Sequence, residues 1–137
     1  MSGDNTLLII GKGAREHAIA DAYSRSGDFT RIVVAPGNNF ITFCLRKDPK
    51  LEVIADQDCN PKDPESVLKT ARLYKADLVD VAYDNAIACG SVDLLREHSF
   101  NTFGPTRLAA IIEWDKNWAR DCMLRYGIPC PGFEHFS

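Results

Sequence analysis

The chain has 137 residues, of which 45% are hydrophobic and 26% charged, a composition typical of one soluble globular domain. Its formal net charge of −3 provides no basic surface for a phosphate backbone, so we expect no nucleic-acid partner. The five cysteines form no C-x-x-C pair, no other pattern of metal ligands is present, and no apolar run is long enough for a signal peptide or a membrane span. We therefore expect reduced thiols, a cytoplasmic protein and no membrane partner.

Short apolar runs alternate with segments of helical periodicity along the chain. Strands are predicted at residues 6–10, 31–35, 51–55, 78–82 and 101–103, the last of them at a sheet edge. A helix is predicted at residues 14–26, and others after four possible N-cap residues, namely Asp63, Ser91, Thr106 and Asp115. This alternation predicts the α/β class, as a Rossmann-like open parallel sheet with helices on both faces.

The helix predicted at residues 14–26 contains apolar side chains that could form one stripe against the sheet. These side chains are Ala14, Ala18, Ile19, Ala22 and Tyr23. Small residues would allow the helix to pack close to the strands, so we expect this stripe to be the buried face.

A glycine-rich turn joins the first predicted strand to this helix. Gly11 and Gly13 allow a tight turn that can direct backbone N–H groups at an anion, and the helix dipole adds to the attraction. Arg15, Glu16 and His17 follow in the first helical turn. Each of the three could be only a solvated residue at a helix start, but as a block behind a glycine turn they indicate a ligand site.

Two common nucleotide motifs are absent from this turn. A dinucleotide fingerprint needs glycine or alanine where Glu16 stands, and an acidic residue at the end of the second strand, which instead ends at Ala35 and Pro36. A Walker loop would end in G-K-[ST], which is missing. The sequence therefore disfavours nicotinamide, flavin and Walker-type nucleotide binding at this turn.

Two sequence motifs together resemble the start of phosphoribosylamine–glycine ligases. Residues 7–18 read LLIIGKGAREHA and residues 33–38 read VVAPGN, where that family typically has I-G-x-G-x-R-E-H-A and A-P-G-N. Residues 101–106 and the segment from Trp114 to Pro129 resemble the family's passage into its ATP-grasp portion. The resemblance implies a Rossmann-like pre-ATP-grasp, substrate-binding domain at residues 1–105. It implies linking helices and the start of a truncated ATP-grasp region at residues 106–137.

Such ligases use ATP and Mg²⁺ to activate glycine as an acyl phosphate, which the amine of 5-phosphoribosylamine attacks to give glycinamide ribonucleotide. The resemblance implies that the first domain helps to bind phosphoribosylamine. The predicted binding residues are those of two turns, which lie at the carboxyl ends of neighbouring strands: Gly11, Gly13, Arg15, Glu16, His17, Pro36, Gly37 and Asn38. Arg15 would hold the ribose phosphate and Asn38 the sugar hydroxyls. Glu16 would either meet the developing charge on the amine, as a possible catalytic group, or simply cap the helix.

The chain departs from the family after the fourth strand. The usual G-P-E motif is replaced by the sequence VAYDNAIA at residues 81–88. Asp84 and Asn85 could bind ribose hydroxyls or the substrate amine, or could be an ordinary turn pair. Lys116 matches a family lysine near the ATP phosphates, although the sequence alone would favour a surface lysine.

In this family most groups that bind ATP and Mg²⁺ lie after the region corresponding to residue 137. We therefore expect the chain alone to be inactive and to work with an ATP-grasp portion of the same or a separate chain. One alternative is a non-catalytic module of the same fold that binds a sugar phosphate or nucleotide. Another is an ATP-grasp ligase with a carboxylase-like first domain, against which the two motifs argue.

Overall fold

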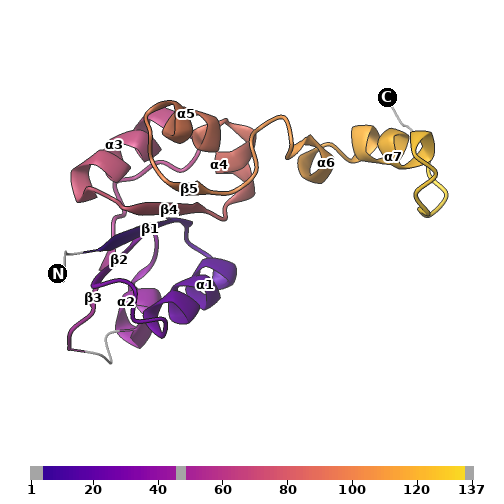
Figure 1. The fold of residues 1–137 in the computed structure, drawn as a ribbon. Helices are drawn as coiled ribbons and strands as arrows, with labels where there is room; N and C mark the ends of the chain where they lie inside the picture. The colour runs from indigo at the N-terminus through magenta and orange to yellow at the C-terminus, as the bar shows by residue number, and fades with distance from the viewer. Residues whose placement is uncertain (1–4, 46–48, 135–137) are drawn as a thin grey trace.

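The computed structural model describes residues 5–45 and 49–134 and contains one parallel sheet (Figure 1). Its strands are β1 (Thr6–Gly11), β2 (Arg31–Pro36), β3 (Glu52–Ala55), β4 (Leu78–Val81) and β5 (Thr102–Phe103). Their spatial order is β3-β2-β1-β4-β5, and every neighbouring pair is parallel. The predicted α/β class and the edge position of the last strand are confirmed. The order reverses between β1 and β4, which makes this gap the switch point where open sheets bind ligands.

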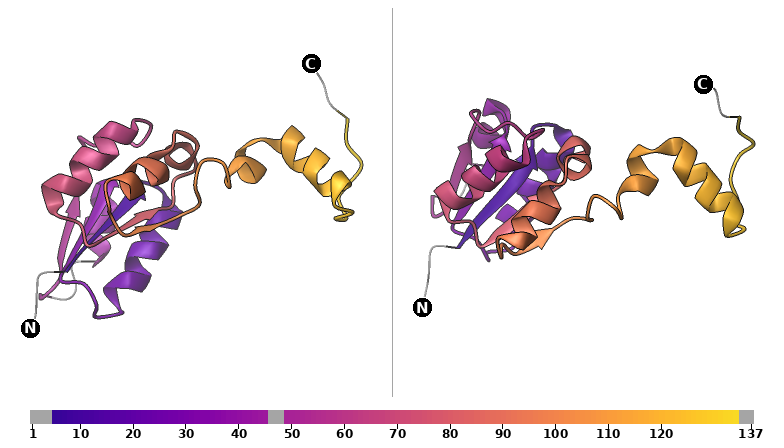
Figure 2. Two further views of the ribbon diagram at one scale, coloured as in Figure 1. Left: turned by 45° about the horizontal axis from the view of Figure 1, so that its top comes forward. Right: turned by 90° about the horizontal axis from the view of Figure 1, so that it is seen from above.

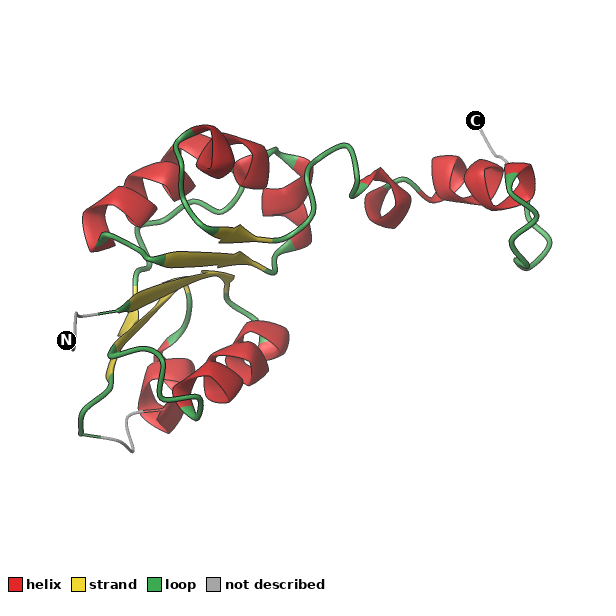
Figure 3. Cartoon of the chain, viewed as in Figure 1, coloured by secondary structure: helices red, strands yellow, loops and turns green. Residues whose placement is uncertain are grey.

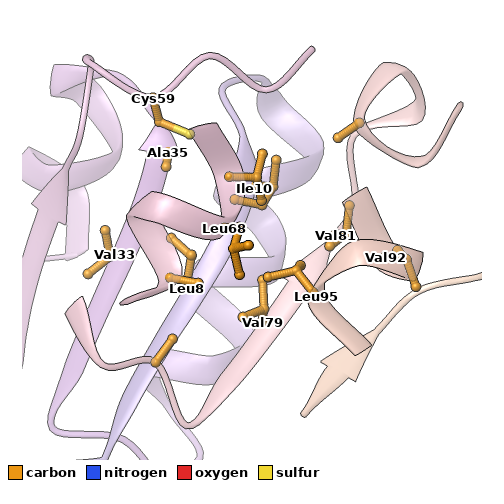
Figure 4. Close-up of a cluster of buried hydrophobic side chains, with 14 residues drawn as sticks. Leu8, Ile10, Val33, Ala35, Cys59, Leu68, Val79, Val81, Val92 and Leu95 are labelled. Carbon is orange, nitrogen blue, oxygen red and sulfur yellow. The ribbon is translucent and has the colours of Figure 1, made fainter. Parts of the chain in front are cut away.

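Helices cover both faces of the sheet, as predicted (Figures 1 and 3). On one face lie α1 (Ala14–Ser24) and α2 (Asn39–Leu45), and on the other lie α3 (Pro64–Tyr74), α4 (Asp84–Ala88) and α5 (Ser91–Glu97). Because side chains alternate along a strand, β1 supplies both cores. Leu7 and Ile9 pack towards α1 and α2, whereas Leu8 and Ile10 join the α3–α5 core drawn in Figure 4.

The predicted buried stripe of α1 is confirmed for Ile19 and Tyr23, which pack against the core, and wrong for its three alanines. Ala14, Ala18 and Ala22 are exposed, while Glu16 and Ala20 are buried. Residues 16, 20 and 23 are spaced at four and three, which places them on one helical face. Methyl groups contribute little burial energy, so the alanines could not decide which face turns inward.

Several local predictions at helix ends can be checked against hydrogen bonds. Asp63 caps α3 by accepting from the Glu65 N–H at 3.1 Å, as expected. Ser91 does not cap α5, because Gly90 is the N-cap and the buried Ser91 hydroxyl lacks a partner. The helices α2 and α4 were not predicted, because their sequences are short and lie beside turn-forming residues.

The carboxyl-terminal segment projects away from the sheet (Figures 1 and 2). It contains α6 (Ile111–Trp114) and α7 (Lys116–Arg125), the latter capped by Asp115, which accepts from the Trp118 N–H at 3.0 Å. Thr106 caps a turn before α6 rather than the helix itself, by accepting from the Ala109 N–H at 3.2 Å. The predicted ranges 1–105 and 106–137 each include residues outside the described part, namely 1–4, 46–48 and 135–137. Within the described part, no helix is long and apolar enough to cross a membrane.

Candidate functional site

Glu16 fills the inside of the turn between β1 and α1. Its Oε2 accepts from the Gly13 N–H at 2.7 Å, its Oε1 accepts from the Arg15 Nε–H at 3.1 Å, and the residue is only 3% exposed. Gly11 has a φ of +142°, and a Cβ there would lie 2.4 Å from the Glu16 Cγ. Glycine is required at residue 11 because the glutamate side chain occupies that space.

This geometry corrects one expectation about the glycine turn. The Gly13 N–H was expected to face an anion, but in this conformation it donates to Glu16. This hydrogen bond supports the alternative role of Glu16, in which it caps the helix. Whether Glu16 also meets charge on a substrate stays a prediction.

The turn after β2 is hydrogen-bonded to the glycine turn. Pro36 pairs in register with Gly11, and the Gly37 N–H donates to the Gly11 carbonyl at 3.0 Å. The side chain of Asn38 donates from Nδ2 to the Lys12 carbonyl at 2.7 Å and accepts at Oδ1 from the Ile41 N–H at 3.0 Å. The structure therefore brings together the two turns that the sequence analysis paired.

Arg15 connects the glycine turn to the segment after β4. Its Nη1 lies 3.1 Å from Asp84 Oδ1, so one arginine is held by two carboxylates across the switch point. The hydrogen bond to Glu16 raises the pKa of Arg15, partial burial opposes this change, and Asp84 adds to it. Asp84 and Asn85 begin α4 instead of forming an isolated turn, and Asn85 Nδ2 donates to the Tyr83 hydroxyl at 3.0 Å.

The sequence analysis missed a cleft beside Arg15, between α1 and the ends of β4 and β5. It has a volume of about 520 Å³, and Asp80 and Tyr23 line it. Asp80 is 4% exposed and accepts at Oδ2 from the Tyr23 hydroxyl at 3.2 Å. Burial raises the pKa of Asp80, and burial together with Asp80 raises the pKa of Tyr23. An aspartate inside the otherwise apolar strand LVDV was the available signal.

Comparison with known proteins identifies the family of this site. Residues 5–113 match the family described as phosphoribosylglycinamide synthetase, N domain. The chain belongs to this family. The match includes both glycine-containing turns, Arg15 and Asp84, and ends before α7.

Individual relatives of this phosphoribosylglycinamide synthetase N domain are longer proteins. The trifunctional purine biosynthetic protein adenosine-3 of Drosophila pseudoobscura pseudoobscura is 35% identical over 133 residues, which is 97% of this chain and 10% of that protein. The phosphoribosylamine–glycine ligase of Streptococcus pneumoniae serotype 4 is 34% identical over 131 residues, covering 96% of this chain and 29% of that ligase. The chain thus spans less than a third of the length of these relatives.

Two predicted site residues lie apart from the Arg15 cluster. The ring of His17 contacts Phe40 of α2 edge-on, with 5.5 Å between centroids, so its known contact is aromatic packing. Lys116 begins α7, which lies away from the sheet in all views (Figures 1 and 2). No group of three or more His, Cys, Asp or Glu residues in the described ranges is placed to hold a metal ion.

Proposed function

We propose that this chain is the substrate-binding amino-terminal part of a phosphoribosylamine–glycine ligase. The reaction joins glycine to 5-phosphoribosylamine at the expense of ATP and gives glycinamide ribonucleotide. The observation that carries the proposal is the position of the Arg15 guanidinium, which lies between Glu16 and Asp84 at the switch point of the sheet. This part of the chain matches the family model.

Arg15 has the chemistry needed to hold the ribose phosphate. A guanidinium has five N–H donors, and the two contacts to Glu16 and Asp84 use Nε and one Nη1 hydrogen. The side chain is 51% exposed, so the remaining donors can reach a ligand. Charge-assisted, paired contacts from arginine suit a phosphate group well. The amino-terminal end of α1 adds a favourable dipole at the same place.

The remaining residues of the site have proposed roles on the ribose and the amine. Asp84 is largely exposed and uses Oδ1 for Arg15, which leaves Oδ2 for a ribose hydroxyl or the amine of phosphoribosylamine. Asn38 can offer its second Nδ2 hydrogen to a sugar hydroxyl while keeping its contact with Lys12. Glu16 positions Arg15, and its negative charge stabilises the amine, which becomes positive as it attacks an acyl group.

ATP and Mg²⁺ would supply the activation of glycine as an acyl phosphate. We propose that Lys116 contacts the nucleotide phosphates and that the other nucleotide and metal ligands belong to the ATP-grasp portion, in the same or a separate chain. We also propose a cytoplasmic location, since Cys44, Cys59, Cys89, Cys122 and Cys130 are all free thiols, which a reducing compartment maintains.

Calorimetric titration with ribose 5-phosphate tests the anion site. Arg15→Ala is expected to raise the Kd at least about tenfold, because charge-assisted hydrogen bonds contribute roughly 1.5–3 kcal/mol. The matched control is Arg25→Ala, which removes an exposed arginine paired with Asp21 at the other end of α1 and should leave the Kd unchanged. Equal binding by wild type and Arg15→Ala would remove the phosphate site from the proposal.

A second assay tests whether the chain needs its ATP-grasp portion. With phosphoribosylamine, glycine, ATP and Mg²⁺, the isolated chain is expected to release no ADP above background. Sustained, glycine-dependent ADP release by the purified chain would contradict the assignment as a substrate-binding part only.

A further inference from the structure

Asp80 occupies a position where the sheet otherwise presents apolar side chains. In the β1–β4 register it lies opposite Ile9, and its side chain is on the α1 face, whereas Val79 and Val81 join the opposite core. On β1 the same face is formed by Leu7 and Ile9. A carboxylate at this position loses most of its hydration, which is costly unless hydrogen-bond donors replace the water.

The protein supplies Asp80 with one donor only among the described residues. The Tyr23 hydroxyl donates to Oδ2, no described donor reaches Oδ1, and Asp80 lines the cleft. Glu16 lies close enough to add negative potential at Asp80. The positive group on the cleft wall is Arg15, which lies at the end nearest the glycine turn. The floor of the cleft is therefore suited to a ligand N–H group, and one end of it to an anion.

The cleft walls are apolar on both sides. Ile19 and Ala22 of α1 form one side, and Phe103 and Pro105 form the other. Phe103 is 66% exposed, which leaves a ring face available for stacking. The volume of about 520 Å³ lies within the range of small-molecule sites, roughly 300–1,000 Å³. Apolar walls with a single buried acceptor favour a planar ring bearing an amino group.

We propose that this cleft binds an aminopurine nucleoside monophosphate. The ring lies between the apolar walls, its exocyclic amino group donates to Asp80 Oδ1, and its phosphate contacts Arg15. The site differs from the nucleotide position proposed for ATP, because Lys116 does not line the cleft. Since Arg15 is shared with the proposed ribose-phosphate site, the two ligands exclude each other. The ring contacts do not depend on the ligase assignment.

Calorimetric titration with AMP and IMP isolates the contact to Asp80. IMP carries a carbonyl oxygen where AMP carries the amino group, so in IMP two acceptors would face each other. We expect AMP to bind wild type at least about tenfold more tightly than IMP, because a site built for a donor rejects an analogue that lacks it. Ribose 5-phosphate is expected to displace AMP competitively.

Asp80→Asn is the decisive variant because it keeps both the size of the side chain and an acceptor for Tyr23. The amide can present either an N–H or an oxygen to the ring, so the AMP preference should fall to about twofold or less. Asp28→Asn, at an exposed position in the turn after α1, is the control and should retain the wild-type preference. Far-UV circular dichroism confirms that both variants are folded.

Three results would overturn the inference. The first is no saturable AMP binding to wild type up to about 10 mM, which corresponds to a binding free energy of roughly −2.7 kcal/mol. The others are equal affinities for AMP and IMP, or an unchanged AMP preference in Asp80→Asn. Ribose 5-phosphate binding should depend on Arg15 and not on Asp80. A failure of the cleft site, seen as an unchanged preference in Asp80→Asn, would thus leave the ribose-phosphate site standing.

Discussion

Replacing Glu16 by glutamine tests the buried carboxylate that organises the glycine turn. Glu16 accepts two hydrogen bonds, from the Gly13 N–H and the Arg15 Nε–H. Glutamine has nearly the same shape but only one oxygen, so its NH₂ group must face one of these two donors. We therefore expect Glu16→Gln to lower the free energy of unfolding.

The expected size of the effect follows from two opposing contributions. Loss of one charge-assisted hydrogen bond costs roughly 1.5–3 kcal/mol. Removing a carboxylate that is 3% exposed recovers part of its desolvation energy. The net loss should be about 1–2 kcal/mol, which corresponds to a fall in Tm of roughly 4–8 °C for a chain of this size.

Urea unfolding at pH 7, followed by far-UV circular dichroism, measures this difference. The matched control is Glu65→Gln in α3, since Glu65 also lies in the first turn of a helix but is exposed. That variant should stay within about 0.5 kcal/mol of wild type. If Glu16→Gln were as stable as Glu65→Gln, the two hydrogen bonds to Glu16 would not stabilise the turn and the reasoning would fail.

Three further predictions concern acidity, sterics and thiol reactivity. Burial raises the pKa of Asp80, so the folded state binds the carboxyl proton more tightly than the unfolded state does. The free energy of unfolding therefore falls as the pH rises above the unfolded-state pKa of about 3.9. Asp80→Asn should therefore exceed wild type in stability at pH 7, with a difference that shrinks towards pH ~4 in urea titrations; a constant difference would contradict this. Gly11→Ala should cost roughly 3 kcal/mol or more because its Cβ would overlap a buried side chain, whereas Gly27→Ala, with open space around it, should cost about 1–2 kcal/mol in thermal unfolding. Burial raises the pKa of the Cys59 thiol, so mass-spectrometric mapping should find Cys59 labelled by iodoacetamide far more slowly than the exposed Cys89.

The parallel sheet and the two glycine-containing turns could be predicted because their signals are local. Uninterrupted apolar runs such as residues 7–10 indicate strands buried on both faces. The strands β1 and β2 begin and end within one residue of their predicted bounds. Asp63 and Asp115 act as predicted because a cap needs only the next few backbone N–H groups. The topology rule for parallel sheets then places the turns after β1 and β2 at one edge.

The tertiary structure decided which way the functional side chains point. Glu16 turns inward because the folded turn leaves the space beside Gly11 to its side chain. Arg15 meets Asp84, 69 residues further along the chain, because β1 and β4 become neighbours in the sheet. The environment of Asp80 depends on the same pairing and on the face of α1 that covers it. Sequence periodicity reports burial along one element, whereas these contacts arise between elements, so only their arrangement in space determines them.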